Sequence, residues 1–214
     1  TDRPEMPEIL NASGMILCAD ARFHDDTSNP LRCIADALDD FGQAAGERLH
    51  GDFAFVHWNG QKLLLGRDHF GVRPLQYTIR SDQYVAFASM PNALLQTGLA
   101  DRTLDAETLK TYPMTGMAIQ PRTYFHQIKS VPAAHLVSIN RSGQSTSRRY
   151  WRLPLNPLIR ADEPPQALAG RLSGLMEQAV QRRLPWRNCM LAARSCHHVW
   201  GNICPRPRNR TSRA

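Results

Sequence analysis

The stretch Gly51–Leu95, GDFAFVHWNGQKLLLGRDHFGVRPLQYTIRSDQYVAFASMPNALL, decides the fold of this chain. Two apolar runs, Asp52–Trp58 and Lys62–Arg67, flank the dipeptide Asn59-Gly60. Asn-Gly between apolar runs predicts a tight β-hairpin in which both turn residues have positive φ. A second hairpin follows after a charged elbow. The stretch therefore predicts two consecutive antiparallel strand pairs.

Both faces of the first predicted strand are apolar. Phe53 and Phe55 point to one side, and Ala54, Val56 and Trp58 point to the other. A strand with one solvated face would alternate apolar and polar residues instead. The run of three leucines at 63–65 repeats the pattern. We therefore expect a sheet that is covered on both faces.

Length and composition allow one sizeable domain plus an appendage, because the chain has 214 residues. No apolar run reaches membrane-spanning length, and the N-terminus lacks a signal-peptide pattern, so a cytoplasmic protein is expected. Five scattered cysteines fit reduced thiols better than a disulfide framework.

The formal net charge of +7 comes from the C-terminal end. No acidic residue follows Glu177, whereas 8 of the 26 basic residues do, which leaves 18 basic against 19 acidic residues in the rest. These arginines are Arg182, Arg183, Arg187, Arg194, Arg206, Arg208, Arg210 and Arg213. The predicted domain itself is nearly neutral.

The remaining elements follow from periodicity and caps. Thr1–Asn11 predicts no element, and Gly14–Phe23 predicts a strand. Asn29 as N-cap and Pro30 at the first position open a helix that Gly42 ends. The apolar stripe of this helix is Leu31, Ile34, Leu38 and Phe41. Shorter helices are expected at Ala44–Leu49 and Pro91–Leu95.

The second half alternates between helices and strands. Asp105 caps a helix, Asp105–Tyr112, that Pro113 ends. Three strands are expected at Tyr124–Ile128, His135–Asn140 and Ser145–Trp151, the last two joined by the polar turn 140–143. After a proline-rich linker, Gln166–Leu184 predicts an amphipathic helix with an apolar stripe at Leu168, Leu172, Leu175, Met176, Ala179 and Leu184.

The central stretch resembles the glutaminase domain of asparagine synthetases and their relatives. The matching signature residues are Gly51, Phe53, Ala54, Phe55, Arg67, Asp68, Gly71, Arg73, Pro74, Leu75, Tyr77, Phe87, Ala88 and Ser89, and Met90 stands where the family usually has Glu. The segment Pro121–Trp151 also resembles the family, with Ala134 where Gly is frequent.

This resemblance implies an incomplete α+β fold, the four-layer αββα sandwich of N-terminal-nucleophile hydrolases. It divides the chain into an unassigned segment 1–13, a partial class II glutaminase-like domain 14–153 and a linker 154–165. Residues 166–184 would be the first helix of an ATP-binding synthetase domain whose remainder is missing. Residues 185–214 form a basic tail, either disordered or out of frame.

The resemblance also implies chemistry that these residues do not support. The family uses a Cys at the mature N-terminus whose α-amino group acts as the base, whereas this chain begins with Thr1. Thr1 as a nucleophile is an alternative, but we expect a truncation point there. Ala19-Asp20-Ala21 stands where the family has a glutamine-binding Asn-Gly-Glu, and the family's glutamine-binding Asp would fall near Asn29 or Pro30, neither of which matches it.

No catalytic or substrate-binding residue is therefore carried over. The sequence Ala-Asp-Ala-Arg instead resembles a divergent branch that includes β-lactam synthetases and lasso-peptide cyclases. The family's Ser-Gly-Gly-x-Asp-Ser loop for ATP pyrophosphate should follow Leu184 by about 10 to 15 residues. Residues 185–214 lack it, which indicates a reading-frame change or a genuine alternative tail.

Several smaller groups of residues are expected to have structural roles or no specific role. The spacing of Cys189, Cys196, His197, His198 and Cys204 lacks a zinc knuckle, so no metal site is expected. The arginine-rich tail predicts no specific nucleic-acid binding. We expect core roles for His57, His69, Cys18 and Cys33. Arg67 and Asp68 are expected to form a structural ion pair.

Two functions remain open from the sequence. In the first, the chain is a partial glutamine amidotransferase-type domain of an asparagine synthase (glutamine-hydrolysing)-like ligase, inactive alone. The intact parent would use ATP and Mg to join a small-molecule or peptide carboxylate to an amine. In the second, the chain is a non-catalytic scaffold domain of a β-lactam-synthetase or lasso-peptide-cyclase-like protein. No membrane partner is expected, and a homodimer is possible.

Overall fold

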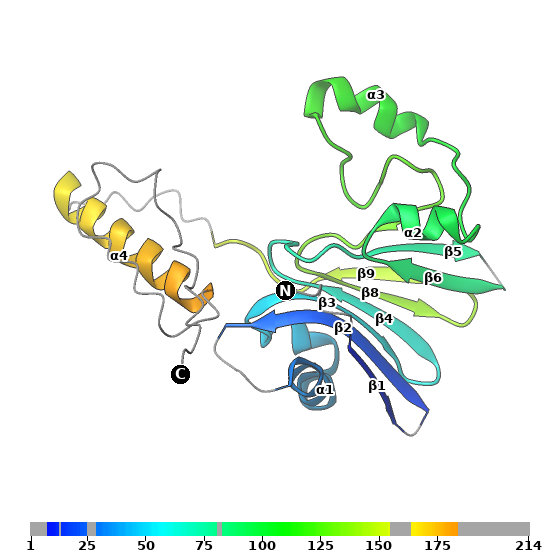
Figure 1. Cartoon of the computed structure of the whole chain (residues 1–214), viewed down its shortest axis with the longest axis horizontal. Coiled ribbons are helices and arrows are strands. Elements are labelled where there is room, and N and C mark those ends of the chain that lie inside the picture. Colours follow the sequence, from blue (N-terminus) through cyan, green and yellow to red (C-terminus); the bar gives the residue numbers. More distant parts are fainter. Residues whose placement is uncertain (1–7, 13, 25–28, 81–82, 155–163, 184–214) are drawn as a thin grey trace, which may run out of the picture. The chain divides into compact units, whose positions relative to one another are not determined.

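A computed structural model describes residues 8–12, 14–24, 29–80, 83–154 and 164–183 of the chain. The chain divides into two compact units, Thr1–Asp162 and Glu163–Ala214. In its described residues the first unit holds two antiparallel sheets with helices outside them (Figure 1). The second unit contributes the helix α4 (Pro165–Arg183).

The larger sheet has six strands in the order β1-β2-β3-β4-β8-β9, and all neighbours pair antiparallel. The smaller sheet has the order β6-β5-β7. The strand bounds are β1 Glu8–Ala12, β2 Met15–Phe23, β3 Gly51–Trp58, β4 Lys62–Arg67, β5 Gln76–Arg80, β6 Tyr84–Ala88, β7 Lys129–Ser130, β8 His135–Asn140 and β9 Ser145–Arg149.

The strand β3 is buried on both faces, as its sequence predicts. Phe53 and Phe55 join a cluster with the buried face of α1 (Pro30–Phe41) and with η1 (Gly42–Glu47). Ala54 and Val56 join a second cluster that includes residues of the smaller sheet. The neighbouring leucines of β4 divide in the same way, because side chains alternate along a strand.

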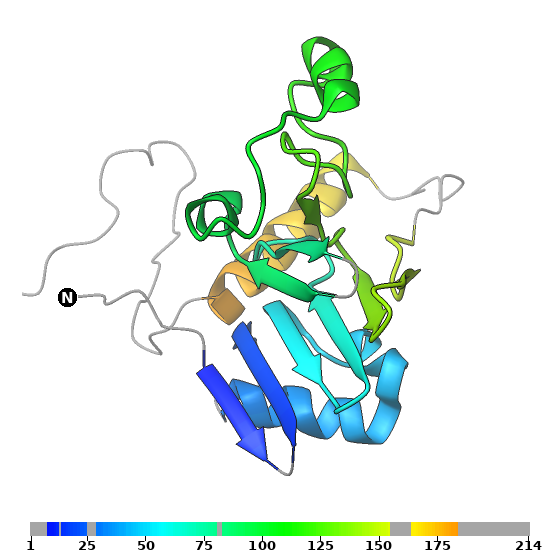
Figure 2. The same ribbon diagram turned by 90° about the vertical axis from the view of Figure 1, so that its right-hand side faces the viewer.

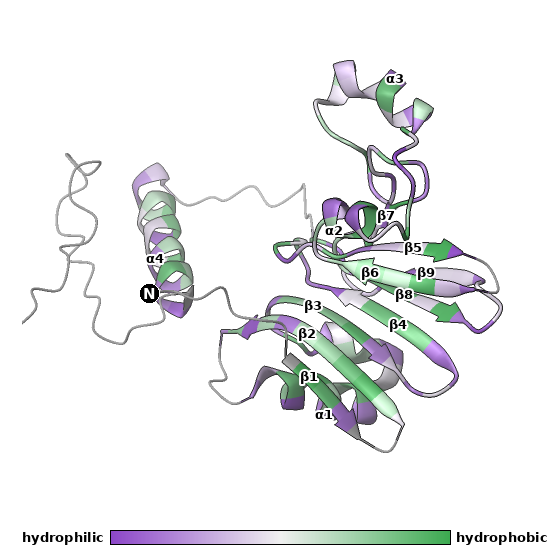
Figure 3. Ribbon diagram, turned by 45° about the vertical axis from the view of Figure 1, so that its right-hand side comes forward, coloured by the Kyte–Doolittle hydropathy of each residue, from purple (hydrophilic) through white to green (hydrophobic). Residues whose placement is uncertain are grey.

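Four layers result from these clusters. The helix α1 and η1 cover the outer face of the larger sheet, and the smaller sheet covers its inner face (Figure 2). The helix α2 (Pro91–Gln96) packs Leu94 and Leu95 against the smaller sheet. The arrangement is an αββα sandwich, which confirms the predicted fold class. Apolar residues concentrate on the paired strands (Figure 3).

The helix α1 forms as its sequence predicts, with one exception. The Asn29 side-chain oxygen accepts hydrogen bonds from the amides of Leu31 and Arg32, and Pro30 occupies the first turn. Leu31, Ile34 and Leu38 are buried, but Phe41 is 46% exposed and stacks under Arg48 instead. Ala37 is the fourth buried position of the helix.

One turn and one short helix differ from the sequence predictions. The β3–β4 turn centres on Gly60 and Gln61, not on Asn59 and Gly60, and only Gly60 has positive φ, at 88°. The Asn59 carboxamide caps the turn by accepting from the amides of Gln61 and Lys62. The short helix predicted at Ala44–Leu49 is the 3-10 helix η1.

Three predicted element boundaries are wrong. The segment without a predicted element contains β1, which exists through its pairing with β2. Residues 124–128 form a turn organised by the Thr123 hydroxyl, which accepts from the amide of Phe125 and donates to the carbonyl of Ile128. The helix α3 (Ala106–Thr115) is capped by Asp105 as predicted but continues through Pro113 to Gly116.

The helix α4 corresponds to the predicted helix 166–184, displaced by one residue at each end. Its stripe residues Leu168, Leu172, Leu175 and Met176 are exposed. Among the described residues, no helix combines the length and the apolar character that crossing a membrane requires.

Replacing Ile34 by alanine tests the packing of α1. Ile34 is fully buried, so Ile34→Ala should lower the free energy of unfolding by about 2–5 kcal/mol. Phe41→Ala on the same helix serves as the matched control and should cost about 1 kcal/mol or less. Urea titration followed by circular dichroism measures both values. Equal losses in the two variants would contradict the observed orientation of α1.

Candidate functional site

The segment Arg67–Leu75, which we call the elbow, carries the chain from one sheet to the other. It begins at the last residue of β4 in the larger sheet and ends just before β5 in the smaller sheet. The elbow holds six of the signature residues, Arg67, Asp68, Gly71, Arg73, Pro74 and Leu75. Its geometry therefore sets how the two sheets stack.

Arg67 is 7% exposed and donates hydrogen bonds to three backbone carbonyls and one side-chain hydroxyl. Its Nε donates to the Arg73 carbonyl at 2.7 Å, and its Nη2 donates to the Gly71 carbonyl at 2.6 Å. Its Nη1 reaches the Val131 carbonyl at 2.8 Å and the Ser130 hydroxyl at 3.3 Å. The guanidinium thus joins the elbow to the segment around β7.

Asp68 is 1% exposed and accepts hydrogen bonds from the elbow's own amides. One carboxylate oxygen accepts from the amides of Phe70 and Val72 at 3.1 and 2.9 Å, and the other accepts from Arg73 at 2.9 Å. The Asp68 amide donates to the Phe53 carbonyl at 2.9 Å. Asp68 therefore folds the elbow and ties it to β3.

Arg67 and Asp68 do not form the ion pair that the sequence suggested. Adjacent residues on an extended chain point in different directions, and each side chain is bonded to backbone groups instead. Burial lowers the pKa of Arg67, and the nearby Asp68 charge opposes that shift. Both side chains hold the local backbone through hydrogen bonds, and not through the ion pair that the sequence suggested.

Gly71 and Ala134 both adopt left-handed backbone conformations at this junction. Gly71 has φ 68°, and a Cβ there would approach the Arg67 guanidinium to about 3.0 Å. Ala134 has φ 58°, a region that glycine adopts without strain. Its amide donates to the Asp68 carbonyl at 2.8 Å, and its carbonyl accepts from the Tyr150 amide at 2.9 Å. These contacts hold Ala134 in place.

An aromatic group covers the elbow near the start of β3. The Tyr150 hydroxyl donates to the Arg67 carbonyl at 2.6 Å, and burial raises the pKa of Tyr150, so it stays a protonated donor. The His69 ring meets Tyr150 and Trp151 edge-on at centroid distances of 5.3 and 5.2 Å. Burial first, and then the neighbouring His50, lower the pKa of His69.

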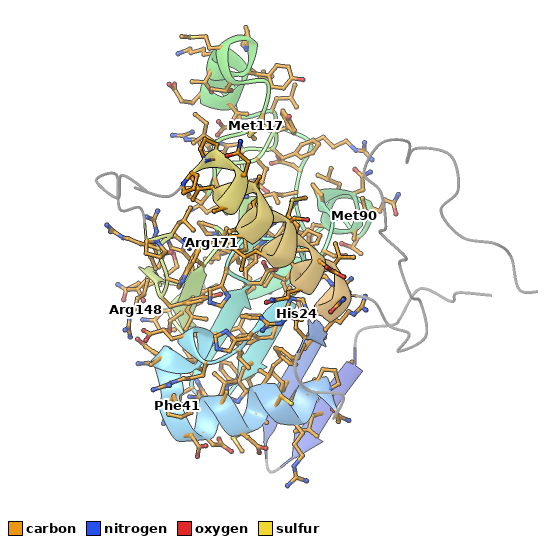
Figure 4. All side chains as sticks on the ribbon, turned by 90° about the vertical axis from the view of Figure 1, so that its left-hand side faces the viewer. His24, Phe41, Met90, Met117, Arg148 and Arg171 are labelled. Carbon is orange, nitrogen blue, oxygen red and sulfur yellow. The ribbon has the colours of Figure 1, made fainter. Side chains whose placement is uncertain are left out.

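The end of β2 brings charged side chains to the same junction. Arg73 lies 3.3 Å from the Asp20 carboxylate, and both side chains are about one-third exposed. His24 lies 3.9 Å from Asp52, and Figure 4 shows His24 at the elbow end of the larger sheet. Asp20 belongs to the Ala19-Asp20-Ala21 stretch, where the resemblance implies glutamine binding. The sequence did not reveal its pairing with Arg73.

The described thiols are not arranged as nucleophiles. Cys18 lies inside β2 and is partly buried, and this burial raises the pKa of its thiol. Cys33 lies within α1. His57 is partly buried in β3, and burial lowers its pKa while Asp39 opposes the shift. Cys189, Cys196, Cys204 and the two histidines at 197–198 lie outside the described residues, as does the arginine-rich tail.

Comparison with known proteins identifies the class. The family described as "Glutamine amidotransferase domain" matches residues 21–151, and the chain belongs to this family. The matched range begins near the end of β2 and includes the elbow and the aromatic group. The chain is also similar to the asparagine synthetase [glutamine-hydrolyzing] 1 of Bacillus subtilis (strain 168), with 32% identity over 156 residues. It is thus a glutamine amidotransferase domain related to asparagine synthetase.

Other relatives are more distant. Amidase chyE of Penicillium rubens is 27% identical over 118 residues, or 53% of this chain. The chain covers 23% of the asparagine synthetase and 16% of the amidase, so it spans less than a quarter of either relative. The similarity to the asparagine synthetase extends over 72% of this chain. The glutamine phosphoribosylpyrophosphate amidotransferase structure from B. subtilis gives a TM-score of 0.47 at 17% identity, over 69% of this chain and 32% of that one.

Replacing Asp68 by asparagine tests the elbow. A carboxamide has one acceptor oxygen, so Asp68→Asn leaves part of the set of buried amide donors unpaired and should cost about 2–4 kcal/mol of stability. Asp20→Asn is the matched control, because its pair with Arg73 is part-exposed and should be worth about 1 kcal/mol or less. Chemical denaturation measures both. A loss in Asp68→Asn no larger than in the control would contradict the role of Asp68.

The lowered pKa of His69 predicts a pH dependence of stability. In the unfolded chain a histidine titrates near 6.5, and in the folded chain His69 titrates below that value. The unfolded state therefore binds more protons in this window, and stability present above pH 6.5 is lost as the pH falls through the folded pKa. Proton NMR titration of the ring gives the pKa. A value at or above 6.5 would contradict the burial of His69.

Proposed function

We propose that this chain serves as the amidotransferase-type domain of an ATP-dependent, amide-forming ligase similar to asparagine synthetase. We propose further that these 214 residues do not hydrolyse glutamine on their own. One observation carries the second part. The buried charges of the signature, Arg67 and Asp68, are fully engaged with backbone groups and are not free to act on a substrate.

The thiols support this proposal. Glutamine hydrolysis by this class needs a thiol whose proton is taken by an adjacent base, and in the N-terminal-nucleophile arrangement that base is the α-amino group of the same residue. Cys18 and Cys33 are internal and have no free α-amino group. The raised pKa of Cys18 also keeps it in the less reactive thiol form.

A second candidate function is a non-catalytic scaffold domain in a protein similar to a β-lactam synthetase or a lasso-peptide cyclase. The observation that favours it is the Asp20–Arg73 pair at 3.3 Å. Where the resemblance implies a glutamine-binding stretch, this chain instead supplies a carboxylate that holds the elbow. Such a domain would keep the fold and the elbow without binding glutamine.

The cofactors of the intact ligase are not assigned to any of the described residues. Within these residues no group of three or more His, Cys, Asp or Glu side chains could hold a metal ion. The place expected for the ATP loop, after Leu184, lies outside them. ATP, Mg and a small-molecule or peptide carboxylate are therefore proposed for a longer protein of the same family, and no step is assigned to this chain's residues.

Incubation of the purified chain with glutamine tests the proposal. We expect ammonia release no faster than from buffer alone, and no covalent labelling of any cysteine by an electrophilic glutamine analogue, as read by mass spectrometry. Cys18→Ser is the matched control and should leave both readouts unchanged. Ammonia release or labelling that Cys18→Ser abolishes would contradict the proposal and would identify an unexpected nucleophile.

A further inference from the structure

The smaller sheet leaves part of one edge uncovered. The strand β7 pairs only with Gln76 and Tyr77 of β5, whereas β5 continues to Arg80. Among the described residues no other strand pairs with this edge of β5. A pocket of about 230 Å³ lies there, between the end of β5 and the turn that precedes β7. Its lining consists of Tyr77, Ile79, Arg80, His126, Gln127 and Lys129.

The lining of this pocket, which we call the edge pocket, is basic. It holds Arg80, Lys129 and His126 and no acidic residue. Neither Arg80 nor Lys129 forms an ion pair with a carboxylate of the described residues. The nearby Asp105 has a basic partner of its own, because it pairs with Arg122 at 3.1 Å, and His126 lies 3.7 Å from the same carboxylate. The charges of Arg80 and Lys129 therefore face a ligand in the edge pocket.

Hydrogen bonds hold the turn that carries His126 and Gln127 in place. The His126 amide donates to the Thr103 carbonyl at 2.9 Å. The Gln127 carboxamide donates to the Asp101 carboxylate at 2.6 Å and accepts from the Asp101 amide at 3.2 Å. Hydrogen bonds from Thr103 first, and then the charges of Arg80 and His126, lower the pKa of Asp101. Asp101 is therefore bonded to the turn and is not part of the pocket lining.

Tyr77 adds a hydroxyl group to the lining of the edge pocket. The residue is 4% exposed, and its hydroxyl forms no hydrogen bond with any described residue. Burial raises the pKa of Tyr77, so the hydroxyl stays a protonated donor. A polar group with so little exposure needs a partner, because an unpaired donor in a protein interior is costly. Water or a ligand oxygen in the edge pocket can supply that partner.

We propose that the edge pocket binds the phosphoryl group of a small phosphate monoester or of free phosphate. A phosphate monoester carries about two negative charges near pH 7, which match the charges of Arg80 and Lys129. A monocarboxylate carries a single charge and matches only half of this set. The Arg80 guanidinium can donate two parallel hydrogen bonds to phosphate oxygens, and the Lys129 ammonium acts as a point charge.

The uncharged part of the lining determines what the phosphoryl group can be attached to. The Tyr77 hydroxyl would donate to a phosphate oxygen. A volume of about 230 Å³ corresponds to roughly eight water molecules, which is more than a phosphate group alone occupies. The remaining space lies against apolar groups, the Ile79 side chain and the Tyr77 ring. A small organic substituent on the phosphate would therefore be in contact with these two residues.

Titration of the isotope-labelled full chain with phenyl phosphate, followed by NMR, tests the proposal. At low ionic strength, where screening is weak, the amide signals of His126, Gln127 and Lys129 should shift with a dissociation constant on the order of 1 mM. Lys129→Ala should weaken binding at least about tenfold, because it removes one of the two charges. Tyr77→Phe should weaken binding about threefold or more, because it deletes the hydroxyl and leaves every charge in place.

Lys110→Ala is the matched control. Lys110 is an exposed residue of α3 outside the pocket lining, so its loss removes the same charge from the same unit and should leave binding unchanged. Inorganic phosphate separates the two sources of the ligand. Weaker binding than that of phenyl phosphate identifies an organic monoester, and equal binding identifies the phosphate group alone. Three results would overturn the proposal: no saturable shifts with either compound, acetate that binds as tightly as phosphate, or Lys110→Ala that weakens binding as much as Lys129→Ala.

Discussion

The sandwich depends on two buried charges at the point where the chain changes sheets. An unpaired charge in a protein interior is costly, so Arg67 and Asp68 must each find a full set of hydrogen-bond partners. They find them in the backbone of the elbow, in the Val131 carbonyl and, through the Asp68 main chain, in β3 and Ala134. Those bonds tie the elbow to the residue after β7, to β3 and to the residue before β8.

The hydrogen bonds of Arg67 and Asp68 explain how the chain can belong to the family without carrying out its chemistry. The family match over residues 21–151 identifies the chain as a glutamine amidotransferase domain, and the buried charged residues of the elbow bind backbone groups of the fold. The carboxylate at Asp20 joins the same network through Arg73. A fold can persist when its site changes, because the residues that hold the layers together differ from those that touch a substrate. The proposed loss of glutamine hydrolysis therefore requires no change in the sandwich.

Local patterns predicted most of the elements, and the family resemblance implied the fold class. The double-sided strand β3, the Asn29 cap and the start of α3 all depend on neighbours within a few residues, and the structure confirms them. The resemblance then supplied the layer order. Local patterns could not predict the long-range contacts. Arg67 bonds to residues 63 and 64 positions away, and Tyr150 bonds to a carbonyl 83 positions away.

The errors have similar physical causes. The strand β1 is short and exists only through pairing with β2, and residues 124–128 look apolar but turn around the Thr123 hydroxyl. Pro113 breaks one hydrogen bond without ending α3, because Gly116 in the left-handed conformation ends it instead. The expectation of an ion pair between Arg67 and Asp68 was wrong because side chains alternate in direction along an extended chain.

Native-state hydrogen exchange at the elbow tests the account most directly. The Val72 and Arg73 amides donate to the Asp68 carboxylate at 2.9 Å, although they lie in a segment outside regular secondary structure. If the elbow holds the two sheets together, these amides should exchange only with global unfolding, at the same free energy as the amides of β3. Exchange of Val72 and Arg73 at the low free energy of an ordinary surface loop, while β3 stays protected, would contradict the account.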